Sequence, residues 1–340
     1  MDELNIWLVG GGLAVGAIFA IVIQQLRFCL VAGTSNLLLI KDSRQAVAFA
    51  VTLLVGITGT QLLELMNIVA VADSSYRNET LDWFGAAVGG IIFGIGAAIA
   101  GGCSVRTLVR TMEGSIHALL ALLSFALVAA VAQFGYLETP RVDLTLATSI
   151  SLKTDAGIAS MLSISPWIVL AVVVIALLLF IFKSSKNGID KQMIAAGFIM
   201  GSLIVVSWYI TGVLAQDDFD PVNPSGITVS GPLARFGYIL ISGRIPALSY
   251  AISFVIGIAV ISFLYAIVRG RFSLTMPAKG MTKMAIIGGS LMGVGSIMAY
   301  GCNIGQGLTG ISTLSVESLL AVVGMVVGIS VTTKIMERNA

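Results

Sequence analysis

Two glycine-rich stretches, GGIIFGIGAAIAGGC at residues 89–103 and GGSLMGVGSIMAYGC at residues 288–302, carry the strongest structural signal in this chain. They keep the same spacing throughout and share five glycines, one alanine and the final cysteine. Small residues recur on one helical face of each stretch, which lets neighbouring backbones approach closely inside a bilayer. Each stretch ends in a Gly-Cys pair, where glycine allows the helix to break. The pattern predicts a duplicated architecture with a candidate site at the two breaks.

The composition places the chain in a membrane. Of its 340 residues, 57% are hydrophobic and only 11% are charged, which is too apolar for one soluble core. Several uncharged runs are long enough to span about 30 Å of hydrocarbon as helices. Helices satisfy their own backbone groups in lipid, so we predict an all-α, polytopic membrane protein.

The apolar runs predict about nine transmembrane helices. They cover roughly residues 6–26, 46–66, 84–101, 115–135, 166–182, 192–211, 246–268, 283–300 and 316–333. The connection after the fourth run contains Asp143 and Asp155, and the connection after the sixth contains Asp217 and Asp218. We interpret both connections as polar external loops.

The basic residues predict an orientation. If the runs alternate in direction, all but five of the 19 Lys and Arg residues fall on one side of the membrane; the exceptions are Arg77, Arg141, Lys153, Arg235 and Arg244. The positive-inside rule then places the N-terminus outside and the C-terminus in the cytoplasm. The first run follows Met-Asp-Glu instead of a basic segment, so we expect a retained helix and not a cleaved signal.

In this orientation the helix that ends at Cys103 runs inward, and the helix that ends at Cys302 runs outward. We therefore predict two inverted repeats in one membrane transport domain spanning residues 1–340. The first repeat covers residues 1–135, a connector helix covers 166–182, and the second repeat covers 192–340. Inverted repeats commonly place a binding site at their interface, near the bilayer midplane.

Three cysteines and their neighbours are the candidate path residues. Free cysteine packs well in cores, so Cys29, taken alone, could equally be a small buried hydrophobic residue without a role in the path. The other two cysteines have glycine and polar neighbours that do not suit an ordinary helix interior. The candidate set is Cys29 with Gly33, Cys103 with Gly102, Ser104 and Arg106, and Cys302 with Gly301, Asn303 and Gln306.

The stretch 303–310 is too polar to face lipid, and we predict a re-entrant segment. Irregular backbone at membrane depth must be buried in protein or line a cavity. Helix N-termini that point toward such a centre would stabilise an anion. The alternative is a plain hairpin turn with a cysteine beside it.

Other residues narrow the function. Arg106 and Arg110 lie four apart and could attract an anion to the inner mouth, although ordinary positive-inside anchoring explains them equally well. A net charge of +2 gives no basic stripe for nucleic acid. His117 is the only histidine, and there is no metal-ligand pattern, Walker loop or Ser-His-Asp constellation, so we expect no metal, cofactor or enzymatic activity.

The motifs RFCLVAG at 27–33, GGCSVRTLVR at 101–110 and YGCNIGQGLTG at 300–310 give the chain a resemblance to the YeeE/YedE family, which includes bacterial thiosulfate transporters. The resemblance covers nearly the whole chain. It implies an hourglass-shaped inner-membrane protein with inward-folded loops and a central path for thiosulfate. It also implies that Cys29, Cys103 and Cys302 line this path, and that a cytoplasmic sulfur carrier of the TusA type is a partner.

We therefore expect uptake of thiosulfate or a related sulfur anion. The S–H group is a weak donor and sulfur is polarizable, so thiols can hold such an anion loosely, as conduction requires. A thiolate would repel it, which leaves neutral thiols or a transient covalent persulfide step. The alternatives are a membrane sulfurtransferase that hands sulfur to a carrier, and a transporter of a selenium compound.

Overall fold

The computed structural model describes residues 6–26, 29–152, 154–184, 190–216, 222–244, 248–278 and 280–338. Arg27, Lys153, Asp217 and Asp218 lie outside the described residues. The helices are α1 (Ile6–Leu26), α2 (Leu30–Leu39), α3 (Arg44–Leu65), η1 (Val71–Asp73), α4 (Trp83–Ala100), α5 (Ser104–Met112), α6 (Ile116–Phe134), α7 (Glu138–Thr148), α8 (Ile158–Leu162), α9 (Pro166–Ser184), α10 (Lys191–Tyr209), η3 (Ile210–Leu214), α11 (Ser230–Ser242), α12 (Tyr250–Val268), α13 (Met281–Met298), η4 (Gly305–Gly310) and α14 (Val316–Arg338). Strands β1 (Thr80–Leu81) and β2 (Ile150–Ser151) form a small antiparallel pair.

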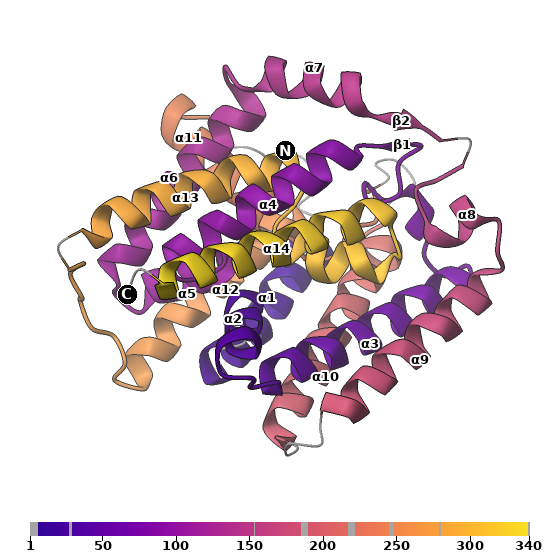
Figure 1. Cartoon of the computed structure of the whole chain (residues 1–340), viewed down its shortest axis with the longest axis horizontal. Coiled ribbons are helices and arrows are strands. Elements are labelled where there is room, and N and C mark those ends of the chain that lie inside the picture. Colours follow the sequence, from indigo (N-terminus) through magenta and orange to yellow (C-terminus); the bar gives the residue numbers. More distant parts are fainter. Residues whose placement is uncertain are drawn as a thin grey trace.

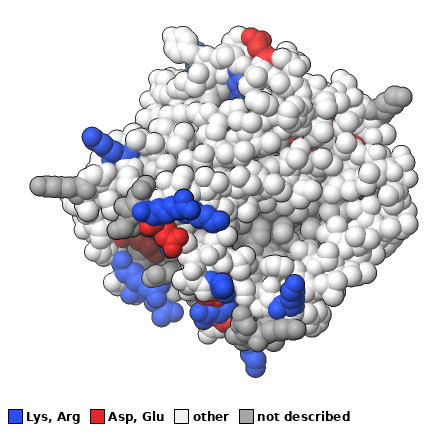
Figure 2. Space-filling view, in the orientation of Figure 1, with Lys and Arg blue, Asp and Glu red and all other residues white. Residues whose placement is uncertain are grey.

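Within the described ranges, nine helical segments are long and apolar enough to cross a membrane, and they coincide with the nine predicted runs. Two of them are broken at a cysteine: Ile6–Leu39 joins α1 to α2 through Cys29, and Trp83–Met112 joins α4 to α5 through Cys103. Figure 2 shows a broad face with almost no charged side chains, whereas Lys, Arg, Asp and Glu gather toward the lower and left edges of this view. The prediction of an all-α, multi-pass membrane protein is confirmed.

The connection between α10 and α12 is more than the polar loop that we inferred from the sequence. It contains α11, which packs against α6 (Figure 1). A Cβ atom on Gly237 would lie 2.0 Å from the carbonyl oxygen of Ala126, so the two backbones touch. With 13 residues, α11 is too short to span the hydrocarbon, and a search for long apolar runs does not detect it.

The glycine-rich stretches form α4 and α13, which pack directly on each other. A Cβ atom on Gly89 would lie 2.6 Å from the backbone nitrogen of Ala299, and one on Gly288 would lie 2.6 Å from that of Ala100. Gly89 on α4 therefore contacts α13 in the same way that its matched residue, Gly288 on α13, contacts α4. Only glycine permits this separation, because any side chain would overlap the partner backbone.

The same reciprocity extends to the next pair of helices. α4 packs on α14, and α13 packs on α6, as the crossing ribbons in Figure 1 show. A Cβ atom on Gly90 would lie 2.3 Å from the carbonyl oxygen of Ala321, and one on Gly289 would lie 2.2 Å from that of Ala121. The repeat that is visible in the sequence is therefore also a repeat of helix packing.

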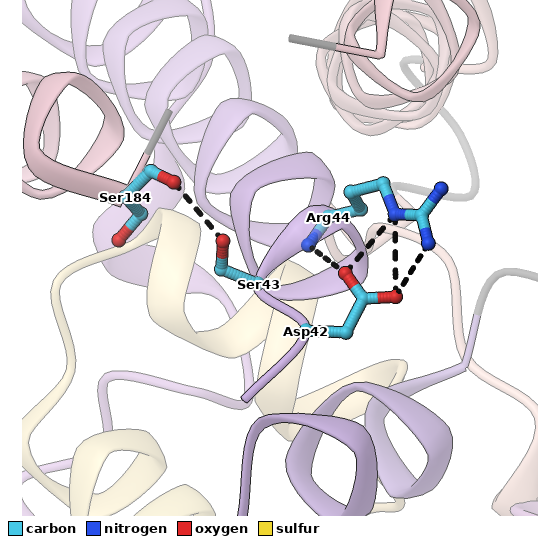
Figure 3. Close-up of polar contacts among 4 residues, drawn as sticks. All are labelled: Asp42, Ser43, Arg44 and Ser184. Carbon is cyan, nitrogen blue, oxygen red and sulfur yellow. Dashed lines mark hydrogen bonds and ion pairs between the residues drawn. The ribbon is translucent and has the colours of Figure 1, made fainter. Parts of the chain in front are cut away.

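Polar links fasten the exposed helix α9 to this bundle at one end. The hydroxyl of Ser43 donates to the carbonyl oxygen of Ser184 over 3.0 Å, which joins the start of α3 to the end of α9 (Figure 3). Beside it, the Arg44 guanidinium donates to both carboxylate oxygens of Asp42. These bonds hold the pKa of Asp42 below its ordinary value.

At another end of the bundle, Arg77 ties two connections together. Its buried guanidinium forms ion pairs with Glu64, at the end of α3, and with Asp155, which follows β2. A charge this deeply buried is tolerated because both carboxylates surround it. The pairs fix the segment between α3 and α4, which also carries Tyr76, against the bundle.

Candidate functional site

Cys29 and Cys103 meet in the core of the molecule. Their sulfur atoms lie 3.8 Å apart, and both side chains are buried and free of disulfide bonds. Each cysteine has an extended backbone and immediately precedes a short helix, α2 for Cys29 and α5 for Cys103. The sequence placed Cys103 at a helix break but gave no indication that it touches Cys29.

Cys302 is fully buried in the same core. It lies at the break between α13 and η4, where Tyr300 adopts a positive φ of 52° before Gly301. The three thiols therefore share the interior of the bundle, and none of them faces lipid.

Helical turns begin at all three cysteines. The carbonyl oxygen of Cys29 accepts from Gly33 N at 2.9 Å, that of Cys103 from Thr107 N at 2.8 Å, and that of Cys302 from Gln306 N at 2.8 Å. The first N–H groups of a helix have no partner within it, and the helix dipole makes this end electropositive. The starts of α2 and α5 therefore favour negative charge beside the two touching sulfurs.

Ser104 and Asn303 occupy matched positions, one residue after the Gly-Cys pair of each repeat. Both side chains are buried, and among the described residues neither the hydroxyl of Ser104 nor Oδ1 of Asn303 has a hydrogen-bond partner. Leaving a buried polar group unsatisfied costs about 1–3 kcal/mol. The Asn303 amide can be turned to present its N–H groups, because oxygen and nitrogen are assigned and not observed. A bound polar ligand would satisfy both residues.

Gln306 supports the chain at the break after α13. Its side-chain amide is already hydrogen-bonded, which leaves it little freedom to bind a ligand. Its Nε2 donates to the carbonyl oxygen of Ala299 over 2.8 Å, and its Oε1 accepts from the hydroxyl of Ser318 over 2.5 Å. Its side chain folds over Gly301, where a Cβ atom would lie 2.9 Å from Gln306 Cγ. Both residues thus shape the turn that carries Cys302.

The remaining candidates are Gly33, Gly102 and Arg106. Gly33 packs at ordinary distance on Gln45, and with Cys29 it lines an apolar cavity of about 340 Å³ between α2, α3, α9 and α14. Gly102 lies against the aliphatic stem of Arg106. Arg106 itself lines a different and polar cavity, beside α5.

Tyr76 and Thr228 border the candidate site, and the sequence did not indicate either of them. A Cβ atom on Gly305 would lie 2.9 Å from the Thr228 hydroxyl and 3.6 Å from that of Tyr76, so both border the segment after Cys302. Burial raises the pKa of Tyr76, which keeps its phenol protonated. Neither residue follows a motif; only the fold brings these two loops together.

Two supports keep Tyr76 in place. Its ring packs edge-on against that of Trp208, with centroids 6.3 Å apart, and the Trp208 indole N–H donates to the Ser312 hydroxyl over 3.2 Å. Trp208, in VSWYITG at 206–212, stands where RFCLVAG at 27–33 has Cys29. In the structure this residue is fully buried and braces the turn between η4 and α14.

His117 has a structural partner. Its Nε2 lies 3.2 Å from the carbonyl oxygen of Ala100, at the end of α4. Within the described ranges, no group of three or more His, Cys, Asp or Glu side chains could hold a metal ion.

Helices that break inside an apolar bundle, with buried thiols and helix N-termini at the breaks, define a multi-pass membrane protein of the transporter type. A family model described as sulphur transport matches residues 26–331, and the chain therefore belongs to this family, the YeeE/YedE family. The resemblance noted in the sequence is confirmed.

Two curated relatives extend over almost the whole chain. The thiosulfate transporter TsuA of Escherichia coli strain K12 is 25% identical over 339 residues, which cover 94% of this chain and 92% of the relative. The thiosulfate transporter TsuA of Spirochaeta thermophila is 28% identical over 332 residues, covering 93% of this chain and 96% of the relative. Both relatives are named as thiosulfate transporters, in keeping with the description of the family.

Proposed function

We propose that the protein imports thiosulfate or a closely related sulfur anion across the bacterial inner membrane, along a central path lined by Cys29, Cys103 and Cys302. The observation that carries this proposal is the buried contact between the Cys29 and Cys103 sulfurs at the starts of α2 and α5. Polarizable thiols next to electropositive helix ends suit an anion that has both a soft terminal sulfur and charged oxygens.

The charge distribution of the sequence favours one orientation of this path in the membrane. With the N-terminus outside and the C-terminus in the cytoplasm, the two repeats are inverted, and the segment after Cys302 faces the outer side. Tyr76 and Thr228 border that segment, so we place the entrance there. The anion then passes Cys103 and Cys29 before it reaches the cytoplasmic side, where a TusA-like sulfur carrier is the proposed recipient.

Neutral thiols bind the anion weakly, so it can pass from one site to the next. A thiolate at this depth would repel a dianion, whereas an S–H group donates only a weak hydrogen bond. The strong contacts come from backbone N–H groups and from the hydroxyl of Ser104, which has no partner among the described residues. Several weak sites in series let the ligand enter and leave, as conduction requires.

Uptake into vesicles tests the substrate. Purified protein in proteoliposomes is expected to accumulate radiolabelled thiosulfate, with unlabelled thiosulfate competing at least about tenfold more effectively than selenite at equal concentration. A tenfold preference corresponds to about 1.4 kcal/mol. Stronger competition by selenite would assign the path to a selenium compound instead.

Mass spectrometry of the same vesicles tests the enzymatic alternative. A transporter with neutral thiols leaves the mass of every cysteine peptide unchanged after turnover. A lasting extra sulfur atom on one cysteine, together with absent flux, would show a sulfurtransferase and overturn the proposal.

A further inference from the structure

A polar cavity of about 660 Å³ opens beside α5, and its lining includes Arg106 but none of the three cysteines. Its charged lining consists of Arg106, Arg110, Arg271 and Glu113, and Gln24 completes the polar wall. We call this space the arginine cavity. Three guanidinium groups and one carboxylate leave it with two net positive charges.

Backbone hydrogen bonds build this cavity from separate parts of the chain. The loop after α12 crosses onto the turn between α5 and α6, where Ser273 N donates to Glu113 O over 3.0 Å and Thr275 N donates to Gly114 O over 3.1 Å. In return, Ile116 N donates to Thr275 O over 3.0 Å. Arg271 is thus held over the cavity by a fixed loop.

Gly114 makes this crossing possible. Its φ of 96° is a conformation that other residues rarely adopt, and a Cβ atom there would lie 2.6 Å from the carbonyl oxygen of Ser273. Specific backbone contacts of the fold therefore bring Arg271 together with Arg106 and Arg110. Positive-inside anchoring alone does not require the three side chains to share a cavity.

The wall of the arginine cavity also contains a buried acceptor that has no hydrogen-bond partner among the described residues. Gln24 is buried, and its Nε2 donates to the carbonyl oxygen of Ser262 over 3.0 Å and to Glu113 at 3.4 Å. Its Oε1 has no partner among the described residues. A hydrated anion would bring water donors to this oxygen, while its own oxygens face the guanidinium groups.

We propose that the arginine cavity is a second binding site, separate from the thiols, for a divalent tetrahedral oxyanion such as sulfate or thiosulfate. Two net positive charges match the two negative charges of such an anion, and guanidinium groups suit its oxygens. Glu113 is the internal counter-charge, which weakens binding enough for release. The role of this site in transport rests on the proposed function, whereas binding itself does not.

Equilibrium binding of radiolabelled sulfate to the purified full-length protein in detergent micelles tests this site. The wild type is expected to bind sulfate saturably. Arg271→Gln should weaken binding at least about tenfold, because it removes one of three facing cations, and Glu113→Gln should tighten it about threefold. Arg269→Gln is the matched control: it makes the same charge change two residues earlier, where the guanidinium lies over the Tyr265 ring, outside the cavity lining.

Binding within twofold of wild type for Arg269→Gln, together with at least tenfold weaker binding for Arg271→Gln, would support a site at the arginine cavity. If Arg269→Gln and Arg271→Gln weakened sulfate binding equally, the effect would come from general surface charge, and the proposal would be overturned. Loss of sulfate binding in Cys302→Ala would assign the anion to the thiol path and also overturn it. Sulfate binding as expected without any thiosulfate uptake would leave the arginine cavity in place and reject the proposed function.

Discussion

Replacement of Cys103 by alanine is expected to reduce thiosulfate uptake at least about tenfold at unchanged protein levels. Cys103 contacts Cys29 and lies at the start of α5, so its removal takes away a soft contact in the middle of the path. A loss of about 1.4 kcal/mol at the highest barrier slows passage tenfold. The measurement is the initial rate of radiolabelled thiosulfate uptake by proteoliposomes. Cys29→Ala and Cys302→Ala are expected to reduce it by similar factors.

Ser296→Ala is the matched control for these cysteine variants. It removes a buried polar atom of α13, but the Ser296 hydroxyl donates to the carbonyl oxygen of Gly293 inside the helix and not toward a break. Uptake close to wild type is expected. If all three cysteine variants also transported at the wild-type rate, the thiols would have no part in permeation.

Gly90→Leu is expected to prevent recovery of folded protein. A Cβ atom at residue 90 would lie 2.3 Å from the carbonyl oxygen of Ala321, so α4 and α14 must separate along their length. Overpacking a well-packed core costs about 1–3 kcal/mol, and more where the clash is with backbone. Size-exclusion chromatography in detergent is expected to show aggregated protein without the monodisperse peak of the wild type.

Gly10→Leu makes the same chemical change where space is open. No atom lies within 4 Å of a Cβ atom on this exposed residue of α1, so the variant should elute like the wild type. Equal recovery of both variants would mean that close packing of α4 on α14 does not hold the bundle together. Gly289→Leu should behave like Gly90→Leu, because it meets the carbonyl oxygen of Ala121 in the same way.

The membrane-spanning helices were predictable because few backbone conformations satisfy their own hydrogen bonds in lipid. Within a bilayer each segment must satisfy its own hydrogen bonds, so a long apolar run predicts a helix with few alternatives. The same reasoning fails for α11, which is too short to span and packs on α6 through Gly237. It fails again for Arg271, whose place is set by backbone bonds between two loops.

The candidate site was predictable in part for a related reason. Matched Gly-Cys pairs indicated Cys103 and Cys302, together with Ser104 and Asn303, because the repeat gave each residue a counterpart. The contact of Cys29 with Cys103 has no such signal, since it joins helices that are distant in the sequence. Tyr76 lay in a connection without any motif, and only the fold brings its hydroxyl close to Gly305.

The most direct test of the account is a structure of the protein in lipid nanodiscs with thiosulfate, by electron cryo-microscopy. The account predicts ligand density at the broken ends of α4 and α13, within hydrogen-bond distance of Ser104 or Asn303 and in contact with a cysteine sulfur. Thiosulfate bound only elsewhere, with the three thiols packed against apolar side chains and no continuous passage between them, would contradict it.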